Sequence, residues 1–398
     1  MAALANGGAA SRYACRGCAA RDAGRIHGAQ REQQAGGGVA PVRRFSFIRN
    51  PRARDLGDSV EDFLRALNGP ACIFFEGEDS SRTRALVTLL HGNEPSGVMA
   101  LFRWLKSGRR PAVNAVCIVA SVAAALEPPL FTHRMLPRAR DLNRCFRPPY
   151  DDAQGALAQE LLEILHLHHP EAVVDIHNTS GSGPSFGVCT FMDARHDALV
   201  GLFTQRLIVS HLGLGALMDI SEHSYPTVTV EVGGRLDSEA HALAWEGLCR
   251  YLAADQLFGE AARAVPMERL HDPIRLELQE HVTLTYAAAP DASYDITLRP
   301  DIEHLNFGTV APDTLLGWAQ SPAASLFVAK DEGGRCAVSR LVRIDGGEIY
   351  PAQALKLFMI TNNAAIASAD CLLYAVAEDG SAIGPYPQAV PDEPAERT

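Results

Sequence analysis

No apolar run in this 398-residue sequence reaches the roughly 18 residues that a membrane-spanning helix requires. The longest candidate, residues 111–126, is interrupted by Asn114 and Ser121 and ends in the sequence Glu-Pro-Pro. It is better explained as a buried strand followed by its exit loop. The sequence therefore predicts a protein that neither crosses a membrane nor has a membrane as its partner.

The sequence also lacks an excess of basic over acidic residues. The 36 Lys and Arg residues face 47 Asp and Glu residues, which gives a formal net charge of −11. General nucleic-acid binding needs a basic surface over the phosphates, so we expect no nucleic-acid partner. The acidic balance says little about a small substrate, because one pocket can be basic on an acidic protein.

The nine cysteines are scattered along the chain and odd in number. Several, such as Cys72 and Cys117, lie in apolar runs, where a free cysteine behaves as a small buried hydrophobic residue. This usage predicts reduced core cysteines and a cytoplasmic protein. Cys15 and Cys18 form a C-x-x-C pair, but no second pair follows at the spacing of a zinc ribbon.

The two ends of the sequence differ from its middle in composition. Residues 1–44 are rich in Gly, Ala, Arg and Gln, carry seven Arg against two acids, and lack the apolar stretch of a secretory signal. We expect a disordered tail there, or a start codon placed too early. An Arg-rich organelle-targeting peptide is the alternative. Residues 386–398 are predicted to be a second tail.

Between the tails, the patterning predicts two domains, residues 45–265 and residues 266–385. In the first, short apolar segments alternate with longer helical patterns, and such alternation is typical of an α/β fold in which helices flank a mostly parallel mixed sheet. Strands are expected at 85–90, 115–122, 172–176 and 227–232, and helices from Pro95, around 157–165, at about 193–212 and at about 238–257. From residue 266 onward, short alternating segments separated by Gly, Pro and Asp turns predict a smaller, β-rich domain.

Two histidines fall directly after predicted strands. In α/β sheets the ligand site lies outside the carboxyl ends of the strands, and His91 and His177 each occupy such an end. Glu94 lies three residues after His91. Catalytic zinc uses three His or carboxylate ligands and keeps an open position for water, so these three side chains predict a zinc site. Asp175 is a candidate hydrogen-bond partner for His177, or a plain structural acid.

Each of these residues also has an ordinary structural explanation. A lone histidine after a strand is more often a hydrogen-bonded loop residue than a metal ligand, and Glu94 alone would suit the first turn of a helix. What favours a site is their combination with Glu231, an acid in the otherwise apolar strand TVTVEV. Glu231 either accepts a proton from a metal-activated water or forms an ion pair at the strand's end.

A basic segment lies between the two histidines. Asp141-Leu142-Asn143-Arg144 follows Arg134, Arg138 and Arg140. Arginine can grip a carboxylate through two parallel hydrogen bonds, and asparagine can add a further donor. The segment is therefore either a carboxylate-binding loop or a solvated basic loop.

Taken together, HGNE at residues 91–94, DLNR at 141–144, DIHN at 175–178 and VEVGG at 230–234 resemble the aspartoacylase and succinylglutamate desuccinylase family, a branch of the zinc carboxypeptidase superfamily. The resemblance covers residues 80–240 best and continues more weakly through HLNFGTVAPDTLLGW and GGEIYP. It implies one Zn²⁺ per chain, held by His91, Glu94 and His177.

The same resemblance assigns roles to four further positions. It implies that Glu231 is the catalytic carboxylate and that Asn143 and Arg144 bind a substrate carboxylate. An arginine would polarise the scissile carbonyl. Arg134 is our choice for that role, and Arg138 and Arg140 are the alternatives.

The sequence departs from the family's pattern at two substrate-recognition positions. The arginine expected about ten residues before the catalytic glutamate is missing from residues 221–225 (SEHSY), and no aromatic pair follows Tyr350-Pro351. We therefore expect a zinc-dependent hydrolase that cleaves the amide bond of a small carboxylate-bearing N-acyl amino acid other than N-acetylaspartate. A carboxypeptidase, an esterase and a non-catalytic zinc-binding protein remain alternatives, and homo-oligomerisation stays open.

Overall fold

The computed structural model describes residues 44–179, 181–211, 213–222, 224–259, 266–369 and 371–384. Both predicted tails, apart from residue 44, lie outside these ranges, and so does the C-x-x-C pair. Across the described ranges, which form one compact unit, no helix is both long and apolar enough to span a bilayer.

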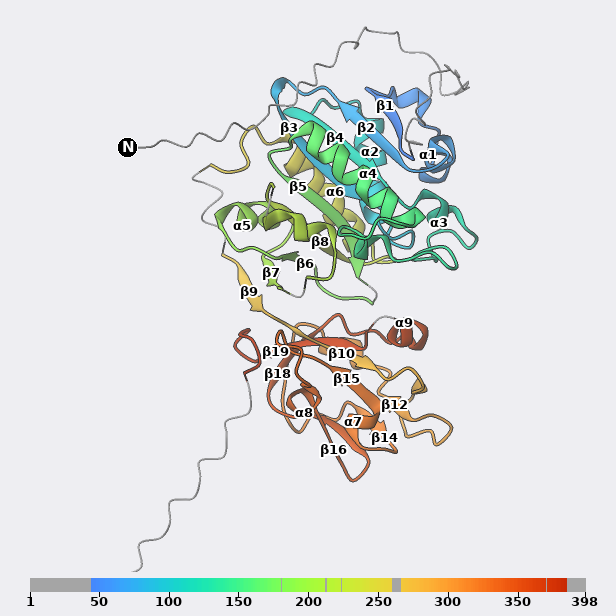
Figure 1. The fold of residues 1–398 in the computed structure, drawn as a ribbon, viewed down its shortest axis with the longest axis vertical. Coiled ribbons are helices and arrows are strands. Elements are labelled where there is room, and N and C mark those ends of the chain that lie inside the picture. The colour runs from blue at the N-terminus through green and yellow to red at the C-terminus, as the bar shows by residue number, and fades with distance from the viewer. Residues whose placement is uncertain are drawn as a thin grey trace, which may run out of the picture. The chain divides into compact units, whose positions relative to one another are not determined.

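A mixed sheet forms the centre of the first domain (Figure 1). Within the described residues it has nine strands, in the order β1-β2-β4-β3-β5-β8-β6-β7-β9. Neighbouring strands in the middle, β4-β3-β5-β8, run parallel, whereas β2 and β6 run antiparallel to their neighbours β4 and β8. The strands are β1 (Ser46–Arg49), β2 (Ala71–Phe75), β3 (Asp79–Thr88), β4 (Val113–Val119), β5 (Val173–Thr179), β6 (Phe186–Cys189), β7 (Arg206–Val209), β8 (Thr227–Gly234) and β9 (Glu268–His271).

Helices cover both faces of this sheet, which confirms the predicted α/β class. Alternate residues of each strand face opposite sides, so Val174 and Ile176 join one core while Val173 joins another. The first core includes side chains of α1 (Val60–Leu67), α2 (Ser96–Ser107), α3 (Val122–Leu126), α5 (Ala194–Gly201) and α6 (Ser238–Ala253). The second is closed by α4 (Ala153–His168), whose Leu157, Leu161 and Ile164 form the predicted apolar stripe. Short 3-10 turns occur at η1 (Ala53–Asp55), η2 (Leu142–Arg144) and η3 (Leu217–Glu222).

The predicted helix at residues 193–212 is wrong in its second half. Helix α5 begins after Asp193, whose side chain accepts hydrogen bonds from the backbone N–H groups of Arg195 and His196, and it ends at Gly201. The chain then forms β7, in which Leu207, Ile208 and Val209 are buried between β6 and β9. A segment with three buried apolar residues, two of them β-branched, gains more from the sheet than from an extra helical turn. The strand expected at 115–122 is likewise shifted, to Val113–Val119.

The second domain is rich in β-structure, as predicted. Its described residues form two five-stranded sheets, ordered β13-β18-β19-β10-β15 and β11-β12-β14-β17-β16, around one apolar core. The strands are β10 (Ile274–Leu278), β11 (Leu284–Tyr286), β12 (Ile296–Leu298), β13 (Thr309–Val310), β14 (Gly317–Ala319), β15 (Phe327–Ala329), β16 (Val342–Asp345), β17 (Glu348–Pro351), β18 (Leu355–Phe358) and β19 (Leu373–Ala377). Short helices are α7 (Ala323–Leu326), α8 (Val338–Leu341), α9 (Ala364–Ala369) and the 3-10 turn η5 (Ile302–Leu305).

One strand connects the two domains. β9 lies in the segment that the sequence pattern assigned to the second domain, yet it pairs with β7 of the large sheet. Two residues later the chain enters β10 of the second domain. A small shared core joins Phe186 and Ile208 of the first domain to Phe358 and Val376 of the second. The large sheet therefore extends past residue 265.

Most described cysteines are buried and free. Cys72, Cys117, Cys145, Cys189 and Cys371 are buried, whereas Cys249 is intermediate and Cys336 is exposed. Burial raises the pKa of the Cys72 thiol to about 12, so it stays protonated. These five positions confirm the expectation of core cysteines.

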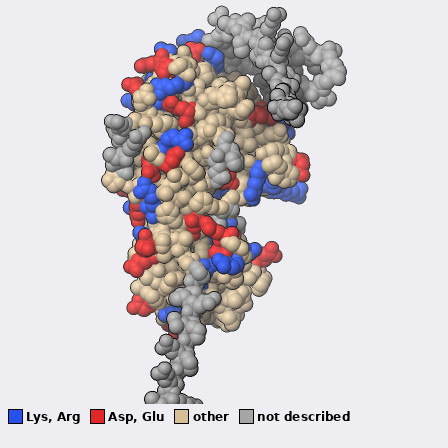
Figure 2. All heavy atoms as spheres, turned by 60° about the vertical axis from the view of Figure 1, so that its left-hand side comes forward, with Lys and Arg blue, Asp and Glu red and all other residues tan. Residues whose placement is uncertain are grey.

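Charged side chains of both signs are interspersed on the face of the protein shown in Figure 2. Lys and Arg alternate with Asp and Glu over the part of that face that the structure describes. Such mixing neutralises the local field within about one Debye length, roughly 8–10 Å at ordinary ionic strength. Charge on this face therefore offers little long-range attraction for a polyanion.

Candidate active site

The three predicted metal ligands meet at the carboxyl ends of β3 and β5. After β3 ends at Thr88, Leu89 adopts a positive φ of 61°, and the chain turns to present His91 and Glu94 before α2 begins. His177 lies near the end of β5, the strand beside β3. Because these strands are parallel, their ends lie at one edge of the sheet, and residues 86 positions apart in sequence come together there.

The donor atoms of these three side chains lie close enough to share one ion. They are all within 4.8 Å of one another, and all three residues are buried. His91 Nδ1 is 2.8 Å from Glu94 Oε1, and His177 Nδ1 is 2.7 Å from Glu94 Oε2. Two imidazole nitrogens and one carboxylate oxygen are ligands that zinc and similar divalent ions accept.

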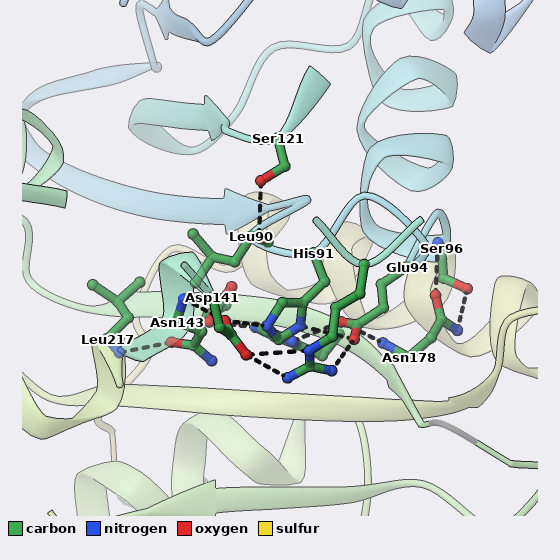
Figure 3. A network of polar contacts seen from close by, with 12 residues as sticks. Leu90, His91, Glu94, Ser96, Ser121, Asp141, Asn143, Asn178 and Leu217 are labelled. Carbon is green, nitrogen blue, oxygen red and sulfur yellow. Dashed lines mark hydrogen bonds and ion pairs between the residues drawn. The ribbon is translucent and has the colours of Figure 1, made fainter. Parts of the chain in front are cut away.

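Each histidine has its own carboxylate on the opposite ring nitrogen. His91 Nε2 lies 2.9 Å from Asp141 Oδ1, and His177 Nε2 lies 2.7 Å from Asp175 Oδ2. Figure 3 shows His91 held between Asp141 and Glu94. Each Nε2–H can donate to the carboxylate beside it, and both Nδ1 atoms face the centre, next to Glu94. This is the arrangement by which proteins orient metal-binding histidines.

Asp141 is a functional residue that the sequence analysis did not assign. It was recognised as part of the DLNR segment, but its contact with His91 spans 50 residues. Its other oxygen, Oδ2, accepts hydrogen bonds from Arg134 Nε and Nη2 at 3.1 and 2.8 Å. Asp141 also accepts from the backbone N–H of Asn143, so it organises the whole basic segment.

The charges in this cluster shift the pKa values of its members. Burial alone would raise the pKa of Glu94, but His91 and His177 outweigh it and hold that pKa well below its usual range. Burial alone would lower the pKa of His177, but Asp175 and Glu94 raise it well above its usual value.

Asn178 forms hydrogen bonds that link the segments carrying the candidate metal ligands. Its side-chain oxygen accepts a hydrogen bond from the backbone N–H of Ser96 at 3.0 Å. Its Nδ2 donates to Ser96 Oγ and to the Gly233 carbonyl, both at 2.8 Å, and its backbone N–H donates to Glu94 Oε2 at 3.3 Å. One buried amide thus ties the first turn of α2 to the ends of β5 and β8. Figure 3 shows its contacts with Ser96.

Glu231 projects into the same pocket from β8. In the parallel pairing of β5 and β8 it is the register partner of His177. Its Oε2 is buried and has no hydrogen-bond partner among the described residues. Burial raises the pKa of Glu231 to about 7, with His177 opposing and Glu94 reinforcing the shift. A carboxyl group with that pKa can both take up and release a proton near neutral pH.

The structure separates the three arginine candidates. Arg134 lines the pocket, and its Nη1 lies 3.6 Å from Glu94 Oε1. Arg140 instead forms an exposed ion pair with Asp152, and neither it nor Arg138 is among the described residues that line the pocket. Of the three, only Arg134 is positioned to reach a group bound at the centre.

Asn143 and Arg144 also line the pocket. Asn143 Oδ1 accepts the backbone N–H of Leu217 at 2.9 Å, which leaves the amide's NH₂ group as its donor for a ligand. Arg144 Nη1 donates to the Asn143 carbonyl at 2.8 Å, and over the described ranges Arg144 forms no ion pair with a carboxylate. The pair can therefore receive a carboxylate from outside the protein.

The remaining wall of the pocket is largely apolar and comes from both domains. Tyr350 of β17 does not belong to it, since its ring packs under Arg343 of β16. The aromatic side chains of the wall are instead Phe186, Phe358 and Tyr374, none of which was singled out from the sequence. The apolar lining residues are Phe186, Val188, Ile208, Leu214, Ala216, Met218, Pro273, Phe358, Met359 and Tyr374.

Comparison with known families gives one match. Residues 80–245 match the model of the succinylglutamate desuccinylase/aspartoacylase catalytic domain. The match contains His91, Glu94, Asn143, His177 and Glu231. No curated protein is similar enough in sequence to count as a match.

Solved structures that resemble this chain have low sequence identity to it. The ectoine utilization protein EutE (DoeB) from Ruegeria pomeroyi has a TM-score of 0.48 at 16% identity, over 75% of this chain and 86% of that one. A succinylglutamate desuccinylase/aspartoacylase from Rhodobacter sphaeroides has a TM-score of 0.47 at 15% identity, over 73% and 83%. Murine aminoacylase 3 has a TM-score of 0.45 at 17% identity, over 75% and 96%.

Proposed function

Residues 80–245 belong to the succinylglutamate desuccinylase/aspartoacylase family of hydrolases, and from this premise we propose that the chain is a zinc-dependent deacylase of small N-acyl amino acids. One observation carries the proposal. A His-Glu-His cluster with carboxylate-backed histidines lies beside the register-paired Glu231, whose buried oxygen has no described partner.

The residues present fit a zinc ion. His91, Glu94 and His177 would hold it, with Asp141 and Asp175 fixing the orientation of the two imidazoles. The cluster supplies three ligands, which is the number that a catalytic zinc site takes from the protein. When bound, zinc would lower the pKa of a coordinated water to roughly 7 and draw charge from the scissile carbonyl.

Glu231 then moves the proton. Its buried carboxylate, whose Oε2 has no hydrogen-bond partner among the described residues, accepts a proton from the attacking water. The resulting carboxyl group donates that proton to the departing nitrogen, so the amine leaves neutral. Arg134 lies beside Glu94 and offers a positive charge to the carbonyl oxygen as charge develops there.

The substrate's carboxylate is held at the other end of the site. Arg144 presents a guanidinium that can form two parallel hydrogen bonds, and the Asn143 amide adds a third. This anchor fixes the distance between the carboxylate and the scissile amide. Substrates that carry a carboxylate near the amide nitrogen are therefore favoured.

The proposal is tested by metal analysis combined with a hydrolysis panel on the full chain. We expect about one zinc per chain and turnover of N-acyl amino acids, abolished by a chelator and restored by zinc. Preferential cleavage of short peptides or simple esters would indicate a carboxypeptidase or an esterase instead. A protein that binds zinc but hydrolyses no member of the panel would overturn the proposal.

A further inference from the structure

We propose that the amino acid released by this site has an apolar side chain, which the wall around Leu214, Met218 and Ile208 receives. This inference rests on the deacylase function proposed above and specifies its substrate class. It follows from where charge and apolar surface lie around the pocket and from how the two are physically connected.

Few of the described residues that line the pocket carry a charge. The described lining residues that carry charge are His91, Glu94, Arg134, Arg144, His177 and Glu231. Arg134 is already paired with Asp141 and lies near Glu94. Arg144 is thus the one lining cation that has no ion pair within the described ranges, and one guanidinium anchors one carboxylate.

The apolar wall is tied directly to this anchor. The segment Leu214–Met218 runs against residues 143–146, where the backbone N–H of Leu217 donates to Asn143 Oδ1 at 2.9 Å and the N–H of Phe146 donates to the Gly215 carbonyl at 3.0 Å. A Cβ on Gly215 would lie 2.8 Å from the Arg144 carbonyl oxygen, so the two backbones touch there.

The contact between the Leu214–Met218 segment and residues 143–146 determines which part of the substrate lies against the apolar wall. In an α-amino acid the carboxylate and the side chain are attached to the same carbon. Once Arg144 and Asn143 hold the carboxylate, the side chain must lie within a few bond lengths of them. Leu214, Ala216 and Met218 flank the anchor and offer only hydrocarbon and thioether surface. The acyl group lies on the far side of the amide bond and is therefore directed elsewhere.

Most of the wall is buried, as Ile208 and Met218 are, and its side chains are closely packed. In the same lining, the ring centroids of Phe186 and Phe358 lie 6.3 Å apart, and those of Phe358 and Tyr374 lie 5.8 Å apart with nearly parallel planes. The Leu214–Met218 segment is fixed by Asp219, whose Oδ2 accepts the N–H groups of Gly215 and Ala216. Packed side chains of this kind do not rearrange to bring in a polar partner.

An acidic side chain would be unfavourable at this wall. A second carboxylate would lose its hydration without gaining a cation. Arg147, the nearest further cation along the chain, lies behind Gly215 and lines a separate hollow with Phe146, His166 and Tyr225. Ser210 and Thr229 add neutral hydroxyl groups to the pocket but no charge.

The test compares kcat/KM of the zinc-loaded full chain for three substrates: N-acetyl-L-leucine, N-acetyl-L-aspartate, and N-butanoylglycine, which moves the apolar group to the acyl side. A hydrophobic pocket typically discriminates by about 10–200-fold, and we expect N-acetyl-L-leucine to exceed both others within that range. Leu214→Arg, at a partly exposed position, should reduce the leucine-to-aspartate ratio at least about tenfold, chiefly through KM.

Leu167→Arg, on the exposed face of α4 and outside the pocket, is the matched control and should leave the ratio unchanged. Leu214→Met should also preserve it, which separates loss of shape from gain of charge. Calorimetric binding of the two acetylated amino acids to the Glu231→Gln protein gives a readout that needs no turnover. Leucine should bind more tightly there as well.

The outcomes for the two proposals are distinct. Equal or faster turnover, or equal or tighter binding, of the aspartate compound would overturn the apolar-substrate inference while leaving the deacylase function intact. A preference for N-butanoylglycine would equally overturn it, because the wall would then receive the acyl group. Failure to hydrolyse any of the three, with tighter binding of the leucine compound, would count against the deacylase function alone.

Discussion

His177 and Glu231 are direct register partners on the neighbouring parallel strands β5 and β8. Paired strands lie about 4.8 Å apart, so the backbone hydrogen bonds of the sheet set the separation between a candidate metal ligand and the candidate proton carrier. Two residues earlier Asp175 pairs in the same way with Thr229. The reacting groups are therefore positioned by the most rigid part of the fold.

Glu231→Gln should remove nearly all turnover while zinc binding persists, because the amide keeps the shape of the side chain but cannot accept the proton. We expect kcat to fall by about 10²–10⁴-fold, the usual contribution of a positioned acid–base group. The measurement is steady-state kinetics together with metal analysis of the same preparation. Full activity in the variant would contradict the role assigned to Glu231.

The same substitution should change the pH dependence of stability in the metal-free protein. The pKa of Glu231 is raised from 4.5 to about 7, so the folded state retains a proton that the unfolded state has released. Its contribution to stability is fully present below pH 4.5 and is lost as the pH rises through 7. At 1.36 kcal/mol per pH unit, the loss amounts to about 3 kcal/mol at most.

Urea denaturation of the metal-free wild type and Glu231→Gln at several pH values measures this difference. The variant should gain in relative stability between pH 4.5 and 7, and the gain should shrink when zinc is added, because a nearby cation favours the carboxylate. Parallel pH curves for the two metal-free proteins would show that Glu231 is not perturbed by burial.

Asp141→Asn and Asp175→Asn should each weaken zinc binding. Each carboxylate holds the Nε2 atom of one histidine, and loss of such a partner typically costs about 10–100-fold in metal affinity. Competition against a chromophoric chelator gives the affinities. Asp152→Asn is the matched control, because Asp152 pairs with exposed Arg140 in the same region and should have no effect.

Arg144→Ala should raise KM for carboxylate-bearing substrates with little change in kcat. A hydrogen bond to a charged group contributes about 1.5–3 kcal/mol, which corresponds to a KM increase of roughly 10–150-fold. Arg140→Ala, which removes an arginine that does not line the pocket, is the control. An unchanged KM in Arg144→Ala would show that the substrate carboxylate binds elsewhere.

Gly97→Ala should destabilise the protein and loosen the metal site. A Cβ there would lie 2.2 Å from Thr88 Oγ1 and 3.0 Å from Ile176 Cβ, so α2 would have to move away from β3 and β5. Overpacking of this kind costs about 1–3 kcal/mol. Chemical denaturation and zinc titration together test both effects, with Met99→Ala on the same helix as the control. A stable variant with normal zinc affinity would contradict this account of the close approach.

The sequence was most informative where local pattern and sheet topology act together. Strand ends that carry His91, Glu94 and His177 could be recognised because parallel strands bring their carboxyl ends to one edge. Asp141 could not be given its role, since nothing near it in sequence points to a histidine 50 residues away. Residues 193–212 were predicted to form one helix, but they include β7. A strand of four residues is too short to show a periodicity that would distinguish it from a helix.

The residues of the pocket wall could not be predicted from the sequence, for a related reason. Phe358 and Tyr374 reach the site only through the packing of one domain against another, and their local sequence is that of ordinary strands. Tyr350, which the sequence pattern did single out, instead packs against Arg343.

Strand β9 binds the large sheet through backbone hydrogen bonds, and the chain passes from it almost at once into the domain that carries Phe358, Met359 and Tyr374. A truncation at residue 265 would therefore leave the backbone hydrogen-bonding groups of β7 unpaired along one edge. It would also expose the candidate active site to bulk water. Substitutions at Phe358, Met359 or Tyr374 would change one side of the pocket while leaving the residues of the large sheet in place.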